Sequence, residues 1–230
     1  MKKIFTSILH LFFPNNCVAC QNELFAGEKF ICLTCQVALP ETNLHKIKNN
    51  LVEQFFMHQK NVQKATAFYF FSKEGKVQHL LHEIKYNDNK ELAFFLGEKM
   101  AKRLNEHNWL EGVDVVIPVP LHQKKLNKRG YNQSLEIAKG FAEVSKIELN
   151  TDALKRIKNT ETQTQKSKME RIENIKNAFV FGQDLISTKK HILLIDDVIT
   201  TASTLNACVE EISKTSEIKI SVLCLAAAIN

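Results

Sequence analysis

The chain has 230 residues, of which 44% are apolar, enough to bury the core of one sizeable domain and a small additional module. Its 31 lysine and arginine residues exceed its 25 acidic residues, and the net charge of +6 permits an anionic partner without requiring one. The longest uninterrupted apolar run, residues 222–229, is far too short for a helix that spans a membrane.

The first thirteen residues, MKKIFTSILHLFF, combine a charged start with an apolar stretch. This pattern is that of a weak signal peptide, but His10 interrupts it and PNNC follows in place of a small-residue cleavage site. We interpret the segment as an amphipathic helix, with peripheral docking on a membrane surface as a further possibility. The expected location of the protein is the cytoplasm.

Four cysteines form two C-x2-C pairs that are separated by eleven residues: Cys17 with Cys20, and Cys32 with Cys35. Two such pairs can meet around a tetrahedral Zn²⁺, and Gly27 can provide the turn between them. The alternative is a pair of disulfides, which would require a secreted protein. Four protein ligands leave no open position on the metal, so we expect the zinc to be structural.

Strand and helix patterns alternate along the rest of the chain. Apolar strand patterns cover residues 65–71, 113–119, 179–181, 192–195 and 218–226. Helical spacing covers residues 77–84, 90–106, 135–142 and 205–212. We therefore predict an α/β fold with a parallel sheet flanked by helices. The expected organisation is a helix and zinc module in residues 1–40, a connector in 41–64 and the α/β domain in 65–230.

The stretch HILLIDDVITTASTLN, residues 191–206, predicts a buried strand, a loop and a helix. Unpaired N–H groups and the helix dipole favour a phosphate at such a junction. Asp196 and Asp197, placed just past the predicted strand, can accept hydrogen bonds from sugar hydroxyls or hold Mg²⁺. The loop hydroxyls that could donate to a phosphate are those of Thr200, Thr201, Ser203 and Thr204. An ordinary strand followed by a capped helix is the plain alternative.

A second strand pattern, residues 113–119, is followed by a predicted basic loop that ends at Gly130. Its charged residues are Lys124, Lys125, Lys128 and Arg129. Loops that follow the carboxyl ends of parallel strands line the ligand site of an α/β sheet, so this loop could hold a pyrophosphate. A solvated surface turn is the alternative. Asn132 or Ser134 is expected to cap the next helix.

Residues 155–176 carry seven basic residues and little apolar periodicity. Such a segment fits a mobile loop that closes over a charged ligand or follows a nucleic-acid backbone. A plain surface loop and helix fits equally well.

These motifs together resemble the ComF family, in the same order and over nearly the whole chain. The matching segments are the paired CxxC motifs, Ile84-Lys85-Tyr86, Val119-Pro120-Leu121, Lys128-Arg129-Gly130-Tyr131-Asn132-Gln133, Gln165 to Asn174, and Asp196-Asp197-Val198 with Thr200-Thr201. The resemblance implies a type I phosphoribosyltransferase-like sheet domain with a small zinc-ribbon-like module. It also implies a role in natural transformation, in the handling of incoming single-stranded DNA, with competence DNA-processing proteins as partners.

Carried over by position, the resemblance assigns a site for phosphoribosyl pyrophosphate (PRPP) and Mg²⁺. Asp196 and Asp197 would hold the ribose and the metal, and Thr200 to Thr204 the 5′-phosphate. Val119, Pro120 and the basic residues that follow would contact the pyrophosphate. A flexible loop from Gln165 to Arg171 would add Lys166 and Arg171 as catalytic cations.

Ala202 departs from the pattern that the family shares with other PRPP-binding chains, Thr-Thr-Gly-x-Thr. If this position needs a positive φ, alanine costs about 1 kcal/mol or more, and its methyl group crowds the phosphate.

Two functions remain open at this stage. The first is a phosphoribosyltransferase, in which a nucleophile displaces pyrophosphate from C1 of Mg-PRPP; the sequence identifies neither the acceptor nor a base for it. The second is a non-catalytic module that binds single-stranded DNA or a partner and keeps only a vestigial PRPP site. In that case the basic loop would contact the backbone, and Tyr131 would offer a ring for base stacking.

Overall fold

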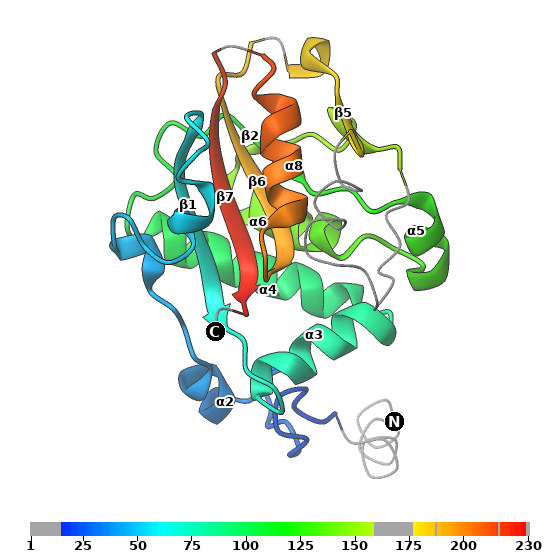
Figure 1. The fold of residues 1–230 in the computed structure, drawn as a ribbon. Helices are drawn as coiled ribbons and strands as arrows, with labels where there is room; N and C mark the ends of the chain where they lie inside the picture. Colours follow the sequence, from blue (N-terminus) through cyan, green and yellow to red (C-terminus); the bar gives the residue numbers. More distant parts are fainter. Residues whose placement is uncertain (1–14, 159–176, 187, 216, 229–230) are drawn as a thin grey trace.

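A five-stranded parallel sheet forms the centre of the computed structural model, which describes residues 15–158, 177–186, 188–215 and 217–228. The strand order is β1-β7-β6-β2-β3, and each neighbouring pair is parallel. The strands are β1 (Val62–Phe70), β2 (Val115–Pro118), β3 (Glu148–Leu149), β6 (His191–Ile199) and β7 (Lys219–Ala227). The predicted α/β class with a parallel sheet is confirmed (Figure 1).

Helices and short 3₁₀ turns connect the strands. The α-helices are α2 (Leu33–Ala38), α3 (Lys76–Tyr86), α4 (Lys90–Asn105), α5 (Gln123–Arg129), α6 (Gln133–Ser145) and α8 (Ser203–Ile212). The 3₁₀ turns are η1 (Leu44–Lys46), η2 (Glu53–Phe56) and η3 (Gln183–Ile186). Among these helices and turns, none has the length and apolar character that would let it cross a membrane.

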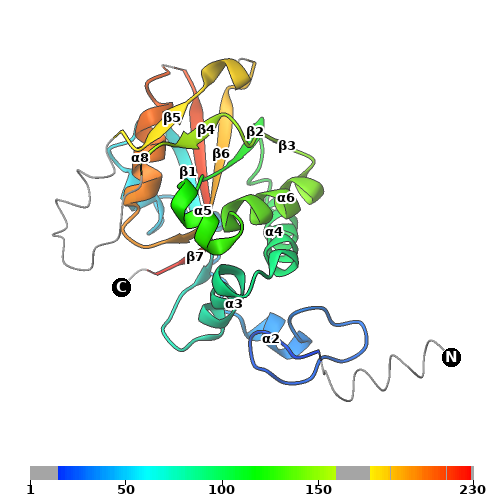
Figure 2. The same ribbon diagram turned by 90° about the vertical axis from the view of Figure 1, so that its right-hand side faces the viewer.

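Both faces of the sheet are buried because helices pack against each of them, and successive residues of the central strand point to opposite faces. Leu193 and Ile195 of β6 belong to a core shared with α3, α4 and α6. Ile192 and Leu194 belong to a second core, which includes the buried face of α8. The apolar run of β6 therefore packs against a layer of helices on each face of the sheet (Figure 2).

Two predictions about the elements are wrong. The segment from Gln123 to Arg129, expected as a loop, is the short helix α5, which ends at Gly130 with a positive φ of 79°. The strand β5 (Phe179–Phe181) does not join the main sheet; it pairs with β4 (Leu154–Arg156) in a separate antiparallel ribbon. The sequence pattern around β4 contains no alternation long enough to have predicted that partner.

The apolar spacing of residues 135–142 predicted a buried face made of Leu135, Ala138, Phe141 and Ala142, and this prediction for α6 is correct only in part. Ala138 and Phe141 are buried, but Leu135 and Ala142 are only half-buried. Ile137, which was not predicted, is fully buried. Asn132 caps this helix, because its side chain accepts a hydrogen bond from the backbone N–H of Ser134. Asn132 also donates to the carbonyl of Val119, which fixes the segment after β2 against the start of α6.

The cysteine-rich segment lies at one end of the molecule, next to α3 (Figures 1 and 2). Its buried residues Cys17, Ile31 and Cys35 belong to the same apolar core as α3 and α4. Lys99 of α4 donates a hydrogen bond of 2.6 Å to the side chain of Gln36, so a polar contact reinforces this packing.

Candidate functional site

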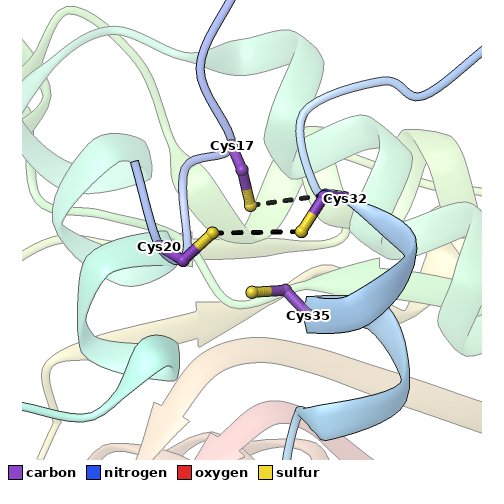
Figure 3. A group of neighbouring side chains, drawn as sticks. All are labelled: Cys17, Cys20, Cys32 and Cys35. Carbon is purple, nitrogen blue, oxygen red and sulfur yellow. Dashed lines mark hydrogen bonds between the residues drawn. The ribbon is translucent and has the colours of Figure 1, made fainter. Parts of the chain in front are cut away.

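The four cysteines of the paired motifs converge on one point (Figure 3). Their Sγ atoms all lie within 4.8 Å of one another, and the Sγ atoms of Cys20 and Cys32 are 3.9 Å apart. Zn–S bonds of about 2.3 Å in a tetrahedron place sulfur atoms about 3.8 Å apart. All six cysteines are free in this structure, which favours a metal site over the disulfide alternative. The donor set and its spacing fit a structural zinc ion.

Local interactions shape the loop that carries these cysteines. The carboxylate of Glu28 accepts hydrogen bonds from the backbone N–H groups of Phe25 and Leu33, at 2.8 and 2.7 Å. Gly27 takes a φ of 92°, as expected for the turn between the two pairs.

Burial raises the pKa of the Cys35 thiol to about 12. At Cys17, burial also acts to raise the pKa, but backbone hydrogen bonds lower it to about 7. A metal cation would stabilise the thiolate form of the buried Cys35.

A second site lies at the carboxyl half of the central strand. Asp196 and Asp197 were expected just past the strand, but they lie within β6, where Asp196 is the register partner of Cys224 on β7. One carboxylate oxygen of Asp196 accepts hydrogen bonds from the hydroxyl of Ser134, at 2.8 Å, and from the backbone N–H of Asp197, at 2.9 Å. The strand and α6 together fix the orientation of this acid.

Burial and the neighbouring carboxylate both disfavour the charged form of Asp196. Burial raises the pKa of Asp196 to about 7, and the neighbouring charge of Asp197 adds to this shift. The hydrogen bond from Ser134 opposes it. A carboxyl pair of this kind gains stability when a cation or a hydrogen-bond donor binds to it.

Cationic side chains from three separate elements surround the acids. Lys85, at the end of α3, forms an ion pair of 3.1 Å with Asp197, and only 21% and 15% of these side chains are exposed. Burial lowers the pKa of Lys125 on α5, the charges of Arg156 and Arg129 lower it further, and Asp197 opposes the shift. Burial also lowers the pKa of Arg156 on β4, against the attraction of Asp196.

The hydroxyl-rich loop runs from the end of β6 into α8. Ala202 precedes the helix with a left-handed φ of 55°, and no side chain caps the first turn of α8. The Thr201 and Ser203 hydroxyl oxygens are 2.9 Å apart, and Thr200 and Thr201 are exposed. Backbone N–H groups of the first turn therefore remain available to an anion.

The basic segment after β2 adjoins the same strand. The backbone N–H of Val119 donates to the carbonyl of Ile195, the residue directly before the acid pair, at 2.9 Å. Pro120 follows Val119, and α5 begins three residues later. Lys124 and Lys128 are exposed, whereas Lys125 and Arg129 are half-buried. The structure thus brings the predicted pyrophosphate segment next to the acids.

Some predicted contacts are not made, and others were missed. Tyr131, expected to offer its ring to a nucleic-acid base, is buried and donates its hydroxyl hydrogen to the carbonyl of Ile84. Lys166 and Arg171 lie outside the described residues, and so do residues 1–13, the segment expected to form an amphipathic helix. Three contributors were missed: Lys85, Ser134 and Arg156. Lys85 lies in a family motif, but only tertiary contacts place these three beside the acids.

Comparison with known proteins gives relatives along nearly the whole chain. Competence protein F of Haemophilus influenzae is 27% identical over 215 residues, which cover 88% of this chain and 91% of that protein. DNA utilization protein YhgH of Escherichia coli K12 is 25% identical over 227 residues, covering 92% and 96%. No family model matches the chain.

Solved structures show a more distant similarity. The glutamine PRPP amidotransferase of B. subtilis aligns with a TM-score of 0.41 and 18% identity, over 63% of this chain and 30% of that one. An allosteric regulatory enzyme of purine biosynthesis aligns with a TM-score of 0.37 over 61% and 29%. The chain thus spans less than a third of either enzyme. By sequence, it is a homologue of Competence protein F and YhgH over about nine tenths of its length, as the resemblance to the ComF family predicted.

Proposed function

We propose that the protein binds PRPP together with Mg²⁺ at the carboxyl half of β6. One observation carries this proposal: the acid pair, Asp196 and Asp197, is followed within one loop by the uncapped start of α8. Carboxylates accept hydrogen bonds from sugar hydroxyls and hold Mg²⁺, while a helix N-terminus binds phosphate. A ligand that carries both groups a few ångströms apart, such as a sugar phosphate, fits this order.

Each part of PRPP has a matching group on the chain. Asp196 and Asp197 would bind the ribose hydroxyls and Mg²⁺, and the backbone of residues 200–204 with its hydroxyls would bind the 5′-phosphate. The segment from Val119 to Arg129 would bind the pyrophosphate, with the half-buried Lys125 within electrostatic reach of Asp197 and with Lys124 and Lys128 exposed to solvent. Lys166 and Arg171 remain candidates for a cationic contribution from the intervening loop.

The reaction that suits this arrangement is displacement of pyrophosphate from C1 by a nucleophile. The transition state has carbocation character at the sugar, and the leaving group accumulates negative charge. The contribution of this chain is to orient the ribose and to stabilise the departing pyrophosphate with Lys125 and its neighbours. Within the part of the chain that the structure describes, no further residue beside the acids stands out as a base for the acceptor, and the acceptor stays unassigned.

The relatives, Competence protein F and DNA utilization protein YhgH, support a role in competence or DNA utilisation. We extend this role to the handling of single-stranded DNA during uptake, in association with competence DNA-processing proteins. The exposed lysines of α5, Lys124 and Lys128, offer positive charge to a phosphate backbone.

The test is calorimetric titration of PRPP with Mg²⁺ into the zinc-loaded protein and into the variant Asp196→Asn/Asp197→Asn. We expect binding by the native protein and at least a tenfold loss in the variant, because both charged acceptors are removed. The control is Asp152→Asn/Asp184→Asn, which removes the same charge from two exposed positions and should bind as the native protein does. Absence of binding by the native protein would overturn the proposal.

A further inference from the structure

Helix α3 contacts the cysteine cluster at one point and the acid pair at another. Near its beginning, the Nδ1–H of His79 donates a hydrogen bond of 3.1 Å to the carbonyl of Ala19. Ala19 is buried and lies between Cys17 and Cys20 in the sequence. This hydrogen bond therefore joins α3 to the loop that carries the first cysteine pair. Figures 1 and 2 both show α3 between α2 and the sheet.

The apolar side of α3 strengthens the same connection. Its buried residues, Val77, Leu80, Leu81 and Ile84, belong to one core together with Cys17, Ala19, Cys32 and Cys35. The cysteine cluster is therefore part of the packing that holds α3, and the helix cannot move independently of it.

The far end of α3 lies at the candidate PRPP site. Lys85 forms the ion pair with Asp197, and the carbonyl of Ile84 accepts the hydroxyl hydrogen of Tyr131, next to the basic segment. Lys85 comes six positions after His79, so the two contacts lie about 9 Å apart along the helix axis. A rigid helix of this length transmits a displacement from one end to the other.

We propose that Lys85 is a positioning residue for the PRPP site and that α3 makes its position depend on the zinc module. This inference rests on the proposed function. With Zn²⁺ bound to the cysteines, the contacts of His79 and the shared core hold α3 so that Lys85 orients Asp197 and offsets its charge. When the cysteines lose the metal, α3 loses this support, and the acids then repel the polyanionic ligand.

Two histidines on α3 give a matched test. Both histidines are exposed, but only His79 contacts the cysteine-rich segment. His79→Ala removes its hydrogen bond to Ala19, whereas His82→Ala changes a residue whose ring lies 4.9 Å from that of Tyr86 on the same helix. We expect His79→Ala to weaken Mg-PRPP binding about fivefold or more, a typical coupling between sites, and His82→Ala to leave it unchanged. Zinc content of one per chain in both variants shows that neither effect comes from loss of the metal.

A double-mutant cycle locates the effect at Lys85. Lys85→Met should weaken binding by itself, and His79→Ala should have no further effect in the Lys85→Met background, since the coupled contact is already gone. Additive losses in the double variant would show that His79 acts through another route, which would overturn the proposal.

The mutual effect of the two ligands on each other's affinity can be measured without an enzymatic assay. If zinc binding tightens Mg-PRPP binding by a given factor, Mg-PRPP must tighten zinc binding by the same factor. Competition with a chelator, with and without saturating Mg-PRPP, measures this factor. Equal zinc affinity in both conditions would contradict the link.

Hydrogen exchange separates failure of the link from failure of the proposed function. Chelation should increase amide exchange in the last turn of α3, residues 83–86, more than in α8, which belongs to the other core. This result would support the link even if the native protein did not bind PRPP. Unchanged exchange in α3, with PRPP binding intact in His79→Ala, would overturn the link and leave the proposed function standing.

Discussion

Ala202 has a left-handed backbone conformation, with φ 55° and ψ 7°, directly before α8. For a residue that carries a Cβ atom, this conformation costs about 1 kcal/mol more than it does for glycine. The residue is also buried, with 5% of its surface exposed, at the point where the proposed 5′-phosphate would meet the helix. Alanine therefore adds both backbone strain and a methyl group to the phosphate loop.

The variant Ala202→Gly should raise the free energy of unfolding by up to about 1 kcal/mol, because glycine adopts a positive φ without a Cβ clash. It should also tighten Mg-PRPP binding. Urea denaturation and calorimetry measure the two effects. Ala207→Gly, the same change inside α8, should instead destabilise the protein by about 0.5 to 1 kcal/mol. A loss of stability in Ala202→Gly would show that no strain is stored there.

At the scale of elements, α4 and α6 pack with their backbones unusually close. A Cβ atom on Gly140 would lie 1.9 Å from the carbonyl oxygen of Phe94, and one on Gly97 would lie 2.0 Å from that of Ile137. This close packing holds α6, and through it Ser134 and the hydrogen bond to Asp196, against the sheet. The position of the acid therefore depends on two glycines far from it in sequence.

Gly140→Ala should lower the free energy of unfolding by about 3 kcal/mol, since backbone atoms must move to admit the methyl group. The comparison is Gly75→Ala, whose Cβ would meet the flexible side chain of Ser72 at 2.3 Å. Because that side chain can rotate away, we expect a loss of about 1 kcal/mol or less. Equal losses in urea denaturation would mean that the helices separate more easily than their packing indicates.

At the scale of the whole molecule, the zinc module and the sheet domain share one core. Cys35 is 1% exposed and lies in the same apolar cluster as α3 and α4. A metal that holds this cluster therefore stabilises more than its own loop, because the buried residues of both parts pack on one another. The loss of one cysteine ligand should therefore lower the free energy of unfolding of the whole chain.

Cys35→Ala should reduce zinc content below one per chain and lower the free energy of unfolding by at least about 2 kcal/mol. Elemental analysis and urea denaturation measure the two effects. Cys224→Ala is the matched control, since Cys224 is equally buried but lies in β7, outside the cysteine cluster. It should keep its zinc. Full zinc content in Cys35→Ala would show that Cys35 is not a ligand.

The sequence alone determined the features that depend on local spacing. The CxxC pairs predicted a four-thiol cluster, and the pattern of Leu205, Cys208, Val209 and Ile212 predicted the buried face of α8; both are confirmed. Periodicity and motif spacing are properties of neighbouring residues, so they can be recognised before the chain folds.

Only the tertiary structure decided which side chains meet at the acid pair. Ser134 and Asp196 are 62 positions apart, and Lys85 reaches Asp197 from an even more distant helix. Tyr131 was expected at the surface, yet packing against α3 buries it. Such contacts follow from how helices pack on the sheet, and that packing depends on shape complementarity across the whole core rather than on any local pattern.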